Sequence, residues 1–208
     1  MPNKKSAQMK GIIFDLGGVV VSNDIIKYVE SNAAKYYGIS RRPIAELRRH
    51  EKGRHRLGWD EKKYWMGFAK SIKSDKPPRL FWTEKYGAVT KPKKDVVDII
   101  KRLKKRYKLA VLSNTCEPHI RSNRTKGIFR LFDAEVFSCD PHVDVEKPGA
   151  KIYRICLKAL KLKGKECVFI DDYAENLAPA RKLGMRTIHF KNARQLKSDL
   201  AKLGVAVK

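Results

Sequence analysis

The sequence predicts an α/β fold: a core built on a Rossmann-like, doubly wound parallel sheet, with a helical cap inserted after the first strand. Two observations lead to this prediction. Short apolar runs alternate with longer segments whose apolar residues recur at helical spacing, as in chains that form parallel sheets with crossover helices. Residues 22–90 break this alternation, because helical patterns there follow one another with no strand pattern between them.

Five apolar runs are expected to form the strands. In the first, residues 11–15, the run Ile12, Ile13 and Phe14 has no polar alternation, so it should be buried on both faces of the sheet. The others lie at 109–114, 134–138, 167–172 and 186–190. Helical patterns accompany the later strands at 95–107, 149–162 and 175–184. We therefore expect residues 1–21 and 91–208 to form the core, and residues 22–90 to form the cap.

The chain is strongly basic, with 47 Lys and Arg against 22 Asp and Glu and a net charge of +25. Such an excess attracts polyanions, including nucleic acid and phosphorylated metabolites. Because the basic residues are spread along the whole chain, nucleic acid is allowed as a partner but not favoured. No apolar run approaches the roughly 20 residues of a membrane span, and residues 1–11 lack the apolar region of a signal peptide. We therefore expect a cytoplasmic protein with no membrane partner.

Polar side chains follow several predicted strands at the point where each strand ends. They are Asp15 after the first, Ser113 and Asn114 after the second, and Asp171 and Asp172 after the fourth, while Lys147 precedes a predicted helix. Carboxyl ends of parallel strands meet at one edge of a sheet, where α/β proteins place their ligands. The sequence therefore predicts three carboxylates, a hydroxyl and an ammonium group around one crevice.

This set of groups suits phosphoryl transfer. Crowded carboxylates need a cation, and oxygen ligands without His or Cys suit Mg²⁺. An ammonium and a hydroxyl group suit phosphoryl oxygens, and a carboxylate that faces a phosphate can attack it to form an aspartyl-phosphate. Each residue alone has an ordinary explanation, such as a helix cap, a turn or a solvated lysine. Their joint placement favours phosphoryl transfer.

Four segments resemble the motifs of the haloacid dehalogenase superfamily: FDLGGVV, VLSNT, VEKPGAKIY and VFIDDYAENLAPARKLGMRTI. The likeness is to the branch that contains bacterial glucose-1-phosphatase and the phosphatase domain of bifunctional epoxide hydrolase. It covers residues 10–21 and 91–208, and the insert matches the helical cap of that superfamily in position and size. The resemblance implies a hydrolase of the phosphatase type, which depends on Mg²⁺ and acts on a small phosphorylated metabolite.

The resemblance also implies a role for each motif residue. Asp15 would be the nucleophile and a Mg²⁺ ligand, and Lys147 would bind the phosphoryl group and steady Asp15. Ser113, Asn114 and Gly18 would contact the phosphoryl group. Asp172 and the main-chain carbonyl of Gly17 would bind Mg²⁺, Asp171 would be a ligand or a support beside it, and Asn176 would support that loop.

Gly17 is the main departure from the superfamily pattern, because many related phosphatases have an aspartate there as general acid and base. Such catalysis is worth about 10²–10⁴-fold. Three explanations stay open: Asp24, His55 or His119 could serve instead, the substrate could have a good leaving group, or the protein could be a retired enzyme that binds a polyanion such as RNA. A dehalogenase-type hydrolase is a further alternative, although it would need no Mg²⁺ and so leaves the Asp171–Asp172 pair unexplained.

The loop before Lys147 is the second departure. It is longer than in relatives and has Asp144 where they carry glycine, so Asp144 or Glu146 could pair with Lys147.

Overall fold

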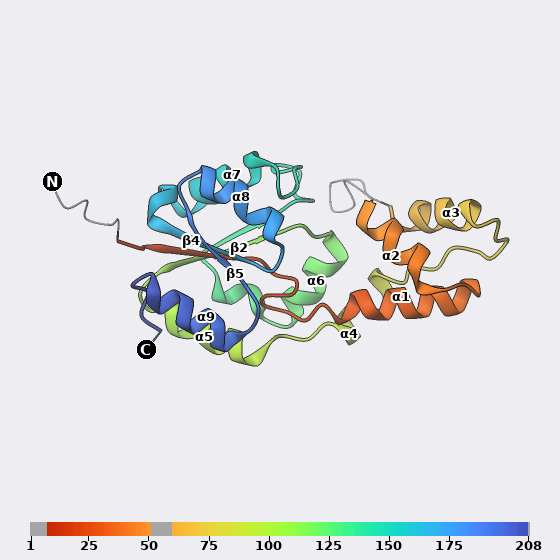
Figure 1. Ribbon diagram of the computed structural model, residues 1–208, viewed down its shortest axis with the longest axis horizontal. Helices are drawn as coiled ribbons and strands as arrows, with labels where there is room; N and C mark the ends of the chain where they lie inside the picture. Colours follow the sequence, from red (N-terminus) through yellow and green to blue (C-terminus); the bar gives the residue numbers. More distant parts are fainter. Residues whose placement is uncertain (1–7, 51–59, 208) are drawn as a thin grey trace.

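The computed structural model describes residues 8–50 and 60–207 (Figure 1). These residues form a five-stranded parallel sheet in the order β3-β2-β1-β4-β5. The strands are β1 (Gly11–Phe14), β2 (Lys108–Ser113), β3 (Ala134–Phe137), β4 (Cys167–Asp171) and β5 (Arg186–His189). Ile12 in the central strand lies opposite Leu109 on one side and Val168 on the other. The predicted doubly wound α/β fold is confirmed.

Helices cover both faces of the sheet, which explains why β1 has no polar alternation. Successive side chains of a strand point to opposite faces. Ile12 and Phe14 therefore pack in one apolar cluster, under α5 (Lys94–Leu103) and α9 (Ala193–Lys202). Ile13 packs in a second cluster, under α7 (Ala150–Leu160) and α8 (Ala174–Lys182). Figure 1 shows the two pairs of helices on opposite sides of the strands.

Two helices of the core lack a strong signal in the sequence. Helix α6 (Glu117–Thr125) has the polar sequence EPHIRSNRT, in which Ile120 is the one buried aliphatic residue. Helix α9 buries Leu196 and Leu200 and is otherwise polar or small. Helices with so few apolar residues are stabilised by tertiary packing rather than by a clear periodic pattern. The short 3₁₀ turns η1 (Ile128–Leu131) and η2 (Gly164–Glu166) are likewise set by their surroundings.

The cap consists of α1 (Asp24–Tyr37), α2 (Arg41–His50), α3 (Glu61–Ser71) and α4 (Thr83–Val89), between β1 and α5 in the chain. It has an apolar cluster of its own around the fully buried Trp65, whose ring meets Tyr37, Phe68 and Phe81. Figure 1 shows α1, α2 and α3 extending away from the sheet. None of the helices described here is long and apolar enough to cross a membrane.

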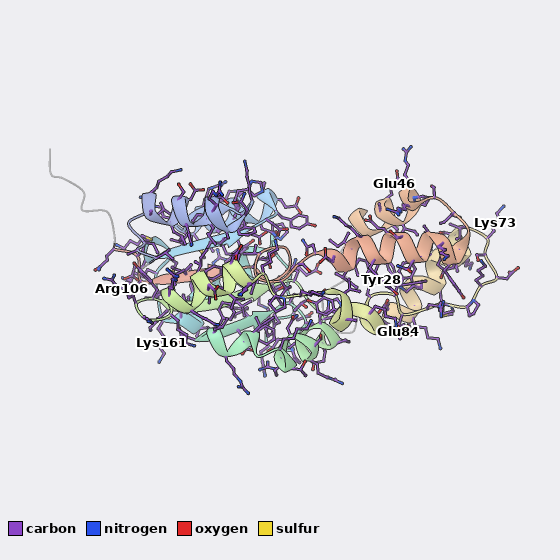
Figure 2. All side chains as sticks on the ribbon, turned by 90° about the horizontal axis from the view of Figure 1, so that it is seen from below. Tyr28, Glu46, Lys73, Glu84, Arg106 and Lys161 are labelled. Atoms are coloured by element: carbon purple, nitrogen blue, oxygen red, sulfur yellow. The ribbon has the colours of Figure 1, made fainter. Side chains whose placement is uncertain are left out.

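Helix α4 joins the cap to the core. The Tyr86 ring stacks on His119 of α6 with 3.7 Å between ring centroids, and Asn123 Nδ2 donates to the Tyr86 hydroxyl at 2.9 Å. Burial raises the pKa of Tyr86 to about 12. Figure 2 shows the two bodies from another side, with Glu46 and Lys73 on the cap and Arg106 on the core. The cap thus rests on the core through a buried aromatic contact.

Candidate functional site

Three carboxylates meet at the carboxyl edge of the sheet. Phe14 of β1 lies opposite Ile170 of β4, so the residues that follow, Asp15 and Asp171, come side by side. The Asp15 N–H donates to the Ile170 carbonyl at 2.9 Å, which continues the strand pairing up to the predicted nucleophile. One carboxylate oxygen from each of Asp15, Asp171 and Asp172 lies within 4.8 Å of the others. The structure thus brings together the three predicted acids.

Lys147 lies between two of these acids. Its Nζ is 2.7 Å from Asp15 Oδ1 and 2.7 Å from Asp171 Oδ2, and its side chain is 2% exposed. Burial works against the ammonium form, but Asp15 and Asp171 outweigh burial and raise the pKa of Lys147. Burial raises the pKa of Asp15 to about 7, although Lys147 acts in the opposite direction. The Lys147 ammonium therefore stabilises the charged form of a deeply buried Asp15.

Asn114 holds the loop that carries Lys147. Its Nδ2 donates to the Lys147 carbonyl at 2.9 Å, and the Lys147 N–H donates to Asn114 Oδ1 at 2.8 Å. Both ends of the amide thus contact the backbone of the residue whose side chain reaches Asp15. Ser113, the last residue of β2, is buried beside it. The phosphoryl contacts of Ser113 and Asn114 stay predictions, and the structure adds a positioning role for Asn114.

Asp171 and Asp172 differ in their hydrogen bonds. Both oxygens of Asp171 accept from Asn176 Nδ2 at 3.1 Å, and Oδ1 also accepts from the Tyr173 N–H at 2.8 Å. Asp172 Oδ2 accepts from Asn23 Nδ2 at 3.1 Å, whereas Asp172 Oδ1 is buried with no partner among the described residues. This contrast favours Asp171 as a support and Asp172 as a ligand.

A cation fits the unpaired oxygen of Asp172. Burial, and then the neighbouring Asp171, raise the pKa of Asp172, although Lys147 and Lys93 act in the opposite direction. Buried polar atoms without partners are uncommon, and an ion is one of the groups that can complete them. Because the nearby donor atoms are carboxylate oxygens, the chemistry of the set suits a hard cation such as Mg²⁺.

The backbone of the Gly17–Gly18 turn lies close to the Asp172 carboxylate. Gly18 has a φ of +78°, and a Cβ added there would lie 2.1 Å from Asp172 Oδ2, so another residue would be strained and would displace this carboxylate. Its N–H donates to the Val21 carbonyl at 2.8 Å, and its carbonyl accepts from Lys93 Nζ. Gly18 thus shapes the turn with both of its backbone groups, and its predicted phosphate contact stays a prediction.

The structure also places the groups proposed to replace an acid at position 17. His119 is buried against Tyr86 between α6 and α4. Asp24 is exposed at the first position of α1. His55 lies outside the described residues. Neither described group is hydrogen bonded to one of the three acids at the edge of the sheet.

The long loop before Lys147 differs from expectation in its pairing. The Lys147 ammonium is held by Asp15 and Asp171, not by Asp144 or Glu146. Asp144 has a φ of +36°, which is in the left-handed region that favours glycine. Asp144 therefore has a backbone conformation that glycine adopts more easily than other residues.

Two residues beside the acids were not found from the sequence. Asn23 Nδ2 donates to Asp172 Oδ2, and Lys93 Nζ donates to the Gly18 carbonyl, although both residues lie outside the four motifs. Burial lowers the pKa of Lys93, while Asp172 and Asp24 act against this shift. Asn23 lies where the chain enters the cap, and Lys93 lies where it leaves the cap. Their contacts therefore depend on the path of the backbone between core and cap, which no local sequence pattern predicts.

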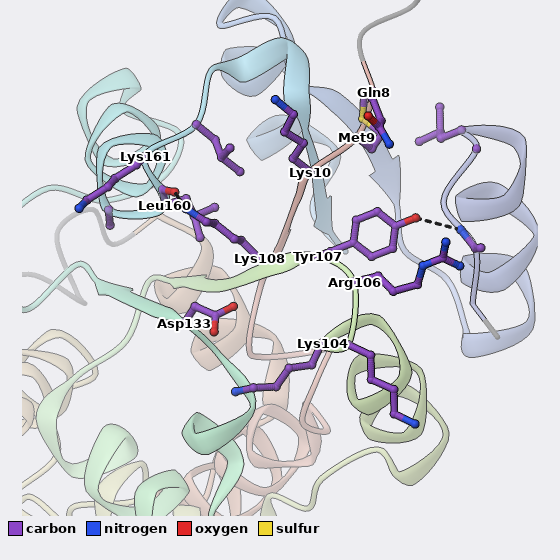
Figure 3. A pocket seen from close by; sticks show the side chains of 16 residues that line it. Gln8, Met9, Lys10, Lys104, Arg106, Tyr107, Lys108, Asp133, Leu160 and Lys161 are labelled. Carbon is purple, nitrogen blue, oxygen red and sulfur yellow. Dashed lines mark hydrogen bonds between the residues drawn. The ribbon is translucent and has the colours of Figure 1, made fainter.

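A hollow lies at the opposite, amino-terminal edge of the sheet (Figure 3). It is a cavity of about 1210 Å³, and among the described residues its lining has one acid, Asp133. The cationic residues that line it are Lys10, Lys104, Lys105, Arg106, Lys108 and Lys161. Lys10 pairs with Glu166 at 2.7 Å, and Lys108 Nζ donates to the Leu160 carbonyl at 3.0 Å. The hollow is thus strongly basic, although part of its charge is already engaged.

Comparisons with known proteins agree with the geometry. The model of the haloacid dehalogenase-like hydrolase family matches residues 9–184. Mouse bifunctional epoxide hydrolase 2 is 42% identical over 72 residues, a match that spans 35% of this chain and only 13% of the mouse protein.

Solved structures show the same fold at low sequence identity. The HAD phosphatase from Thermococcus onnurineus has a TM-score of 0.66 at 19% identity, covering 92% of this chain and 98% of the other. A HAD family enzyme from Bacteroides thetaiotaomicron, in complex with magnesium and inorganic phosphate, has a TM-score of 0.65 at 18% identity, covering 88% and 94%. The family model matches most of this chain, so the chain belongs to the haloacid dehalogenase-like hydrolases.

Proposed function

We propose that this hydrolase is a Mg²⁺-dependent phosphatase that acts on a small phosphomonoester through an aspartyl-phosphate intermediate. One observation carries the proposal: a buried lysine pairs with the predicted nucleophile at the same sheet edge where an Asp172 oxygen has no partner among the described residues. A structural neighbour with magnesium and inorganic phosphate bound supports it.

In this proposal Asp172, Asp15 and the Gly17 carbonyl hold Mg²⁺. When bound, the ion offsets the charge that opposes the approach of a carboxylate to a phosphate. The Asp15 oxygen that Lys147 does not hold attacks phosphorus. The new bond from Asp15 to phosphorus forms as the ester bond breaks, and the electron pair of that bond leaves with the alcohol oxygen.

The second step restores the enzyme. A water oxygen bonds to phosphorus, the bond from phosphorus to Asp15 breaks, and inorganic phosphate leaves as the Asp15 carboxylate is regenerated. In the free enzyme Lys147 is an ammonium, because Asp15 and Asp171 beside it raise its pKa. Asn114 keeps the Lys147 backbone in place during both steps.

The test is the release of phosphate from p-nitrophenyl phosphate and from a panel of phosphomonoesters. We expect turnover with Mg²⁺, loss of turnover in EDTA, and recovery when Mg²⁺ is restored. No hydrolysis across the panel would contradict the proposal. Halide release from a haloacid that continues in EDTA would favour dehalogenase chemistry instead.

A second candidate function, binding of a polyanion such as RNA, is favoured by the basic hollow at the amino-terminal edge. It ranks second because helices α5, α7 and α9 end there, and cations near helix C-termini also offset the helix dipoles. Salt-dependent RNA binding that is weakened by Arg106→Glu and Lys161→Glu would support it. RNA binding that these substitutions leave unchanged would count against this hollow as the site.

A further inference from the structure

Lys93 is the N-cap residue of α5, where the chain returns from the cap, and it holds the turn that follows Asp15 at two points. Its backbone N–H donates to the Val20 carbonyl at 2.9 Å, and its side-chain Nζ donates to the Gly18 carbonyl. Nζ also lies 4.9 Å from the centre of the Phe190 ring, just after β5. One residue thus joins two carbonyls of the turn to each other and to the end of a neighbouring strand.

The turn is also tied to the two segments by which the chain enters and leaves the cap. The Gly18 N–H donates to the Val21 carbonyl at 2.8 Å, and Val21 pairs with Pro92 in an isolated antiparallel bridge. The Ser22 N–H donates to the Lys91 carbonyl at 2.8 Å. Because the entry and exit segments pair with each other, the backbone that carries the lysine side chain is held close to the turn.

This turn borders two of the three clustered acids. Asp15 lies two residues before Gly17 in the chain. A Cβ added to Gly18 would lie 2.1 Å from Asp172 Oδ2, so the backbone of the turn packs directly against that carboxylate. One oxygen of Asp15 and one of Asp172 lie within 4.8 Å of each other. A shift of the turn would therefore change the spacing of the oxygens that could hold a cation.

We propose that Lys93 is a positioning residue for the cation site, and that it sets the spacing of Asp15 and Asp172 through the turn that borders both. This role rests on the proposed Mg²⁺-dependent function. Groups that orient metal ligands without touching the metal typically change metal affinity or activity about 10–100-fold when they are replaced. Lys93 acts one step further out, through the Gly18 carbonyl, so we expect an effect at the lower end of this range.

The positive charge of Lys93 makes the sign of this effect decisive. Its Nζ donates to Gly18, whose backbone lies against Asp172, so an ammonium group stands close to the cation site. Like charges repel, so removing the lysine charge should by itself strengthen Mg²⁺ binding. If Lys93 positions the site, removing its side chain should weaken Mg²⁺ binding instead. The charge and the positioning role therefore predict opposite changes in affinity.

The test is the Kd of Mg²⁺, measured by calorimetry on the full chain. We expect Lys93→Met to bind Mg²⁺ about tenfold more weakly than the natural sequence. Lys93→Arg keeps a cationic donor that can stack on Phe190, so it should retain most of the affinity. The matched control is Lys94→Met, which removes the same charge from the next, exposed residue and should bind Mg²⁺ at least as tightly as the natural sequence.

The outcomes separate this role from the proposed function. Equal or tighter Mg²⁺ binding by a folded Lys93→Met would overturn the positioning role and leave the phosphatase function standing. A natural sequence that neither binds Mg²⁺ nor hydrolyses any phosphomonoester would overturn the proposed function, and the role of Lys93 with it.

A second readout uses the natural sequence and does not depend on how any variant folds. Coupling between two sites is reciprocal, so if a fixed turn favours Mg²⁺ binding, bound Mg²⁺ should favour the fixed turn. We expect Mg²⁺ to slow the hydrogen exchange of the Gly18 and Lys93 N–H groups, which close the turn, by up to about tenfold. The control is the Gly38 N–H at the end of α1, whose exchange should not change. Exchange at Gly18 and Lys93 that Mg²⁺ leaves unchanged would overturn the positioning role.

Discussion

The core and the cap both bury a carboxylate, but they satisfy it in different ways. In the cap, Glu61 accepts from Trp65 Nε1 at 3.0 Å, from the Trp82 N–H at 2.6 Å and from the Thr83 N–H at 3.0 Å. Both of its oxygens are used, and they join α3 to the first turn of α4. In the core, Asp172 keeps a buried oxygen with no partner in the described part of the chain.

The difference separates a structural carboxylate from a functional one. A helix N-terminus presents unpaired N–H groups that a carboxylate can satisfy completely, so Glu61 needs no ligand. A buried acceptor without a partner is costly, and an ion that completes it is one explanation for such a group. We therefore expect substitutions at the core site to affect activity and metal binding in addition to stability, and substitutions at Glu61 to affect stability without a loss of metal binding.

The largest effect is expected from Lys147→Met. The substitution leaves Asp15 and Asp171 buried without their cation, and breaking a buried ion pair costs about 3–5 kcal/mol. Urea denaturation at neutral pH measures this cost, and phosphatase turnover should be lost as well. The matched control is the exposed Lys151→Met, for which we expect a change within about 0.5 kcal/mol. Similar unfolding curves for the two variants would contradict the central place of Lys147.

Mg²⁺ should stabilise the folded protein by a somewhat smaller amount. A ligand at 100 times its Kd adds about 2.7 kcal/mol to the free energy of unfolding. Thermal melts with Mg²⁺ and with EDTA measure this gain, which should largely disappear in Asp172→Asn. An equal gain in Asp172→Asn would place the ion elsewhere.

Glu61→Ala should destabilise the protein by about 2 kcal/mol, because it leaves buried donors of Trp65 and Trp82 without an acceptor. Glu61→Gln keeps one acceptor oxygen and should cost less. Chemical denaturation of both variants measures the difference. If Glu61→Gln lost as much Mg²⁺ affinity as Asp172→Asn, the proposed distinction between a structural carboxylate in the cap and a functional one in the core would be wrong.

The smallest effect is a pH dependence of cap stability. Burial raises the pKa of Glu61 above its ordinary value of 4.5, although its hydrogen bonds act against the shift. The folded state therefore binds more protons than the unfolded state above pH 4.5, so this contribution to stability is complete below that pH and is lost as the pH rises through the folded pKa. The stability of the natural sequence minus that of Glu61→Gln should fall over this window. If this stability difference instead rose with pH, the pKa of Glu61 would be lowered in the folded state, which would contradict the prediction.

The sequence was sufficient to predict the fold class and the three acids at one edge. Apolar runs such as Ile12–Phe14 mark buried parallel strands, and parallel strands bring Asp15 and Asp171 to the same edge. It was not sufficient for α6, whose polar sequence gives no helical period. Nor could it predict the contact of Asn23 with Asp172, because 149 residues separate the two and the turn at Gly18 sets their distance.

The nucleophilic role of Asp15 is tested most directly by acid quenching during turnover, followed by mass spectrometry of the peptide that contains this residue. We expect a phosphorylated Asp15 in the natural sequence with Mg²⁺ and p-nitrophenyl phosphate. We expect neither adduct nor turnover in a folded Asp15→Asn variant. Undiminished turnover by Asp15→Asn would contradict the mechanism.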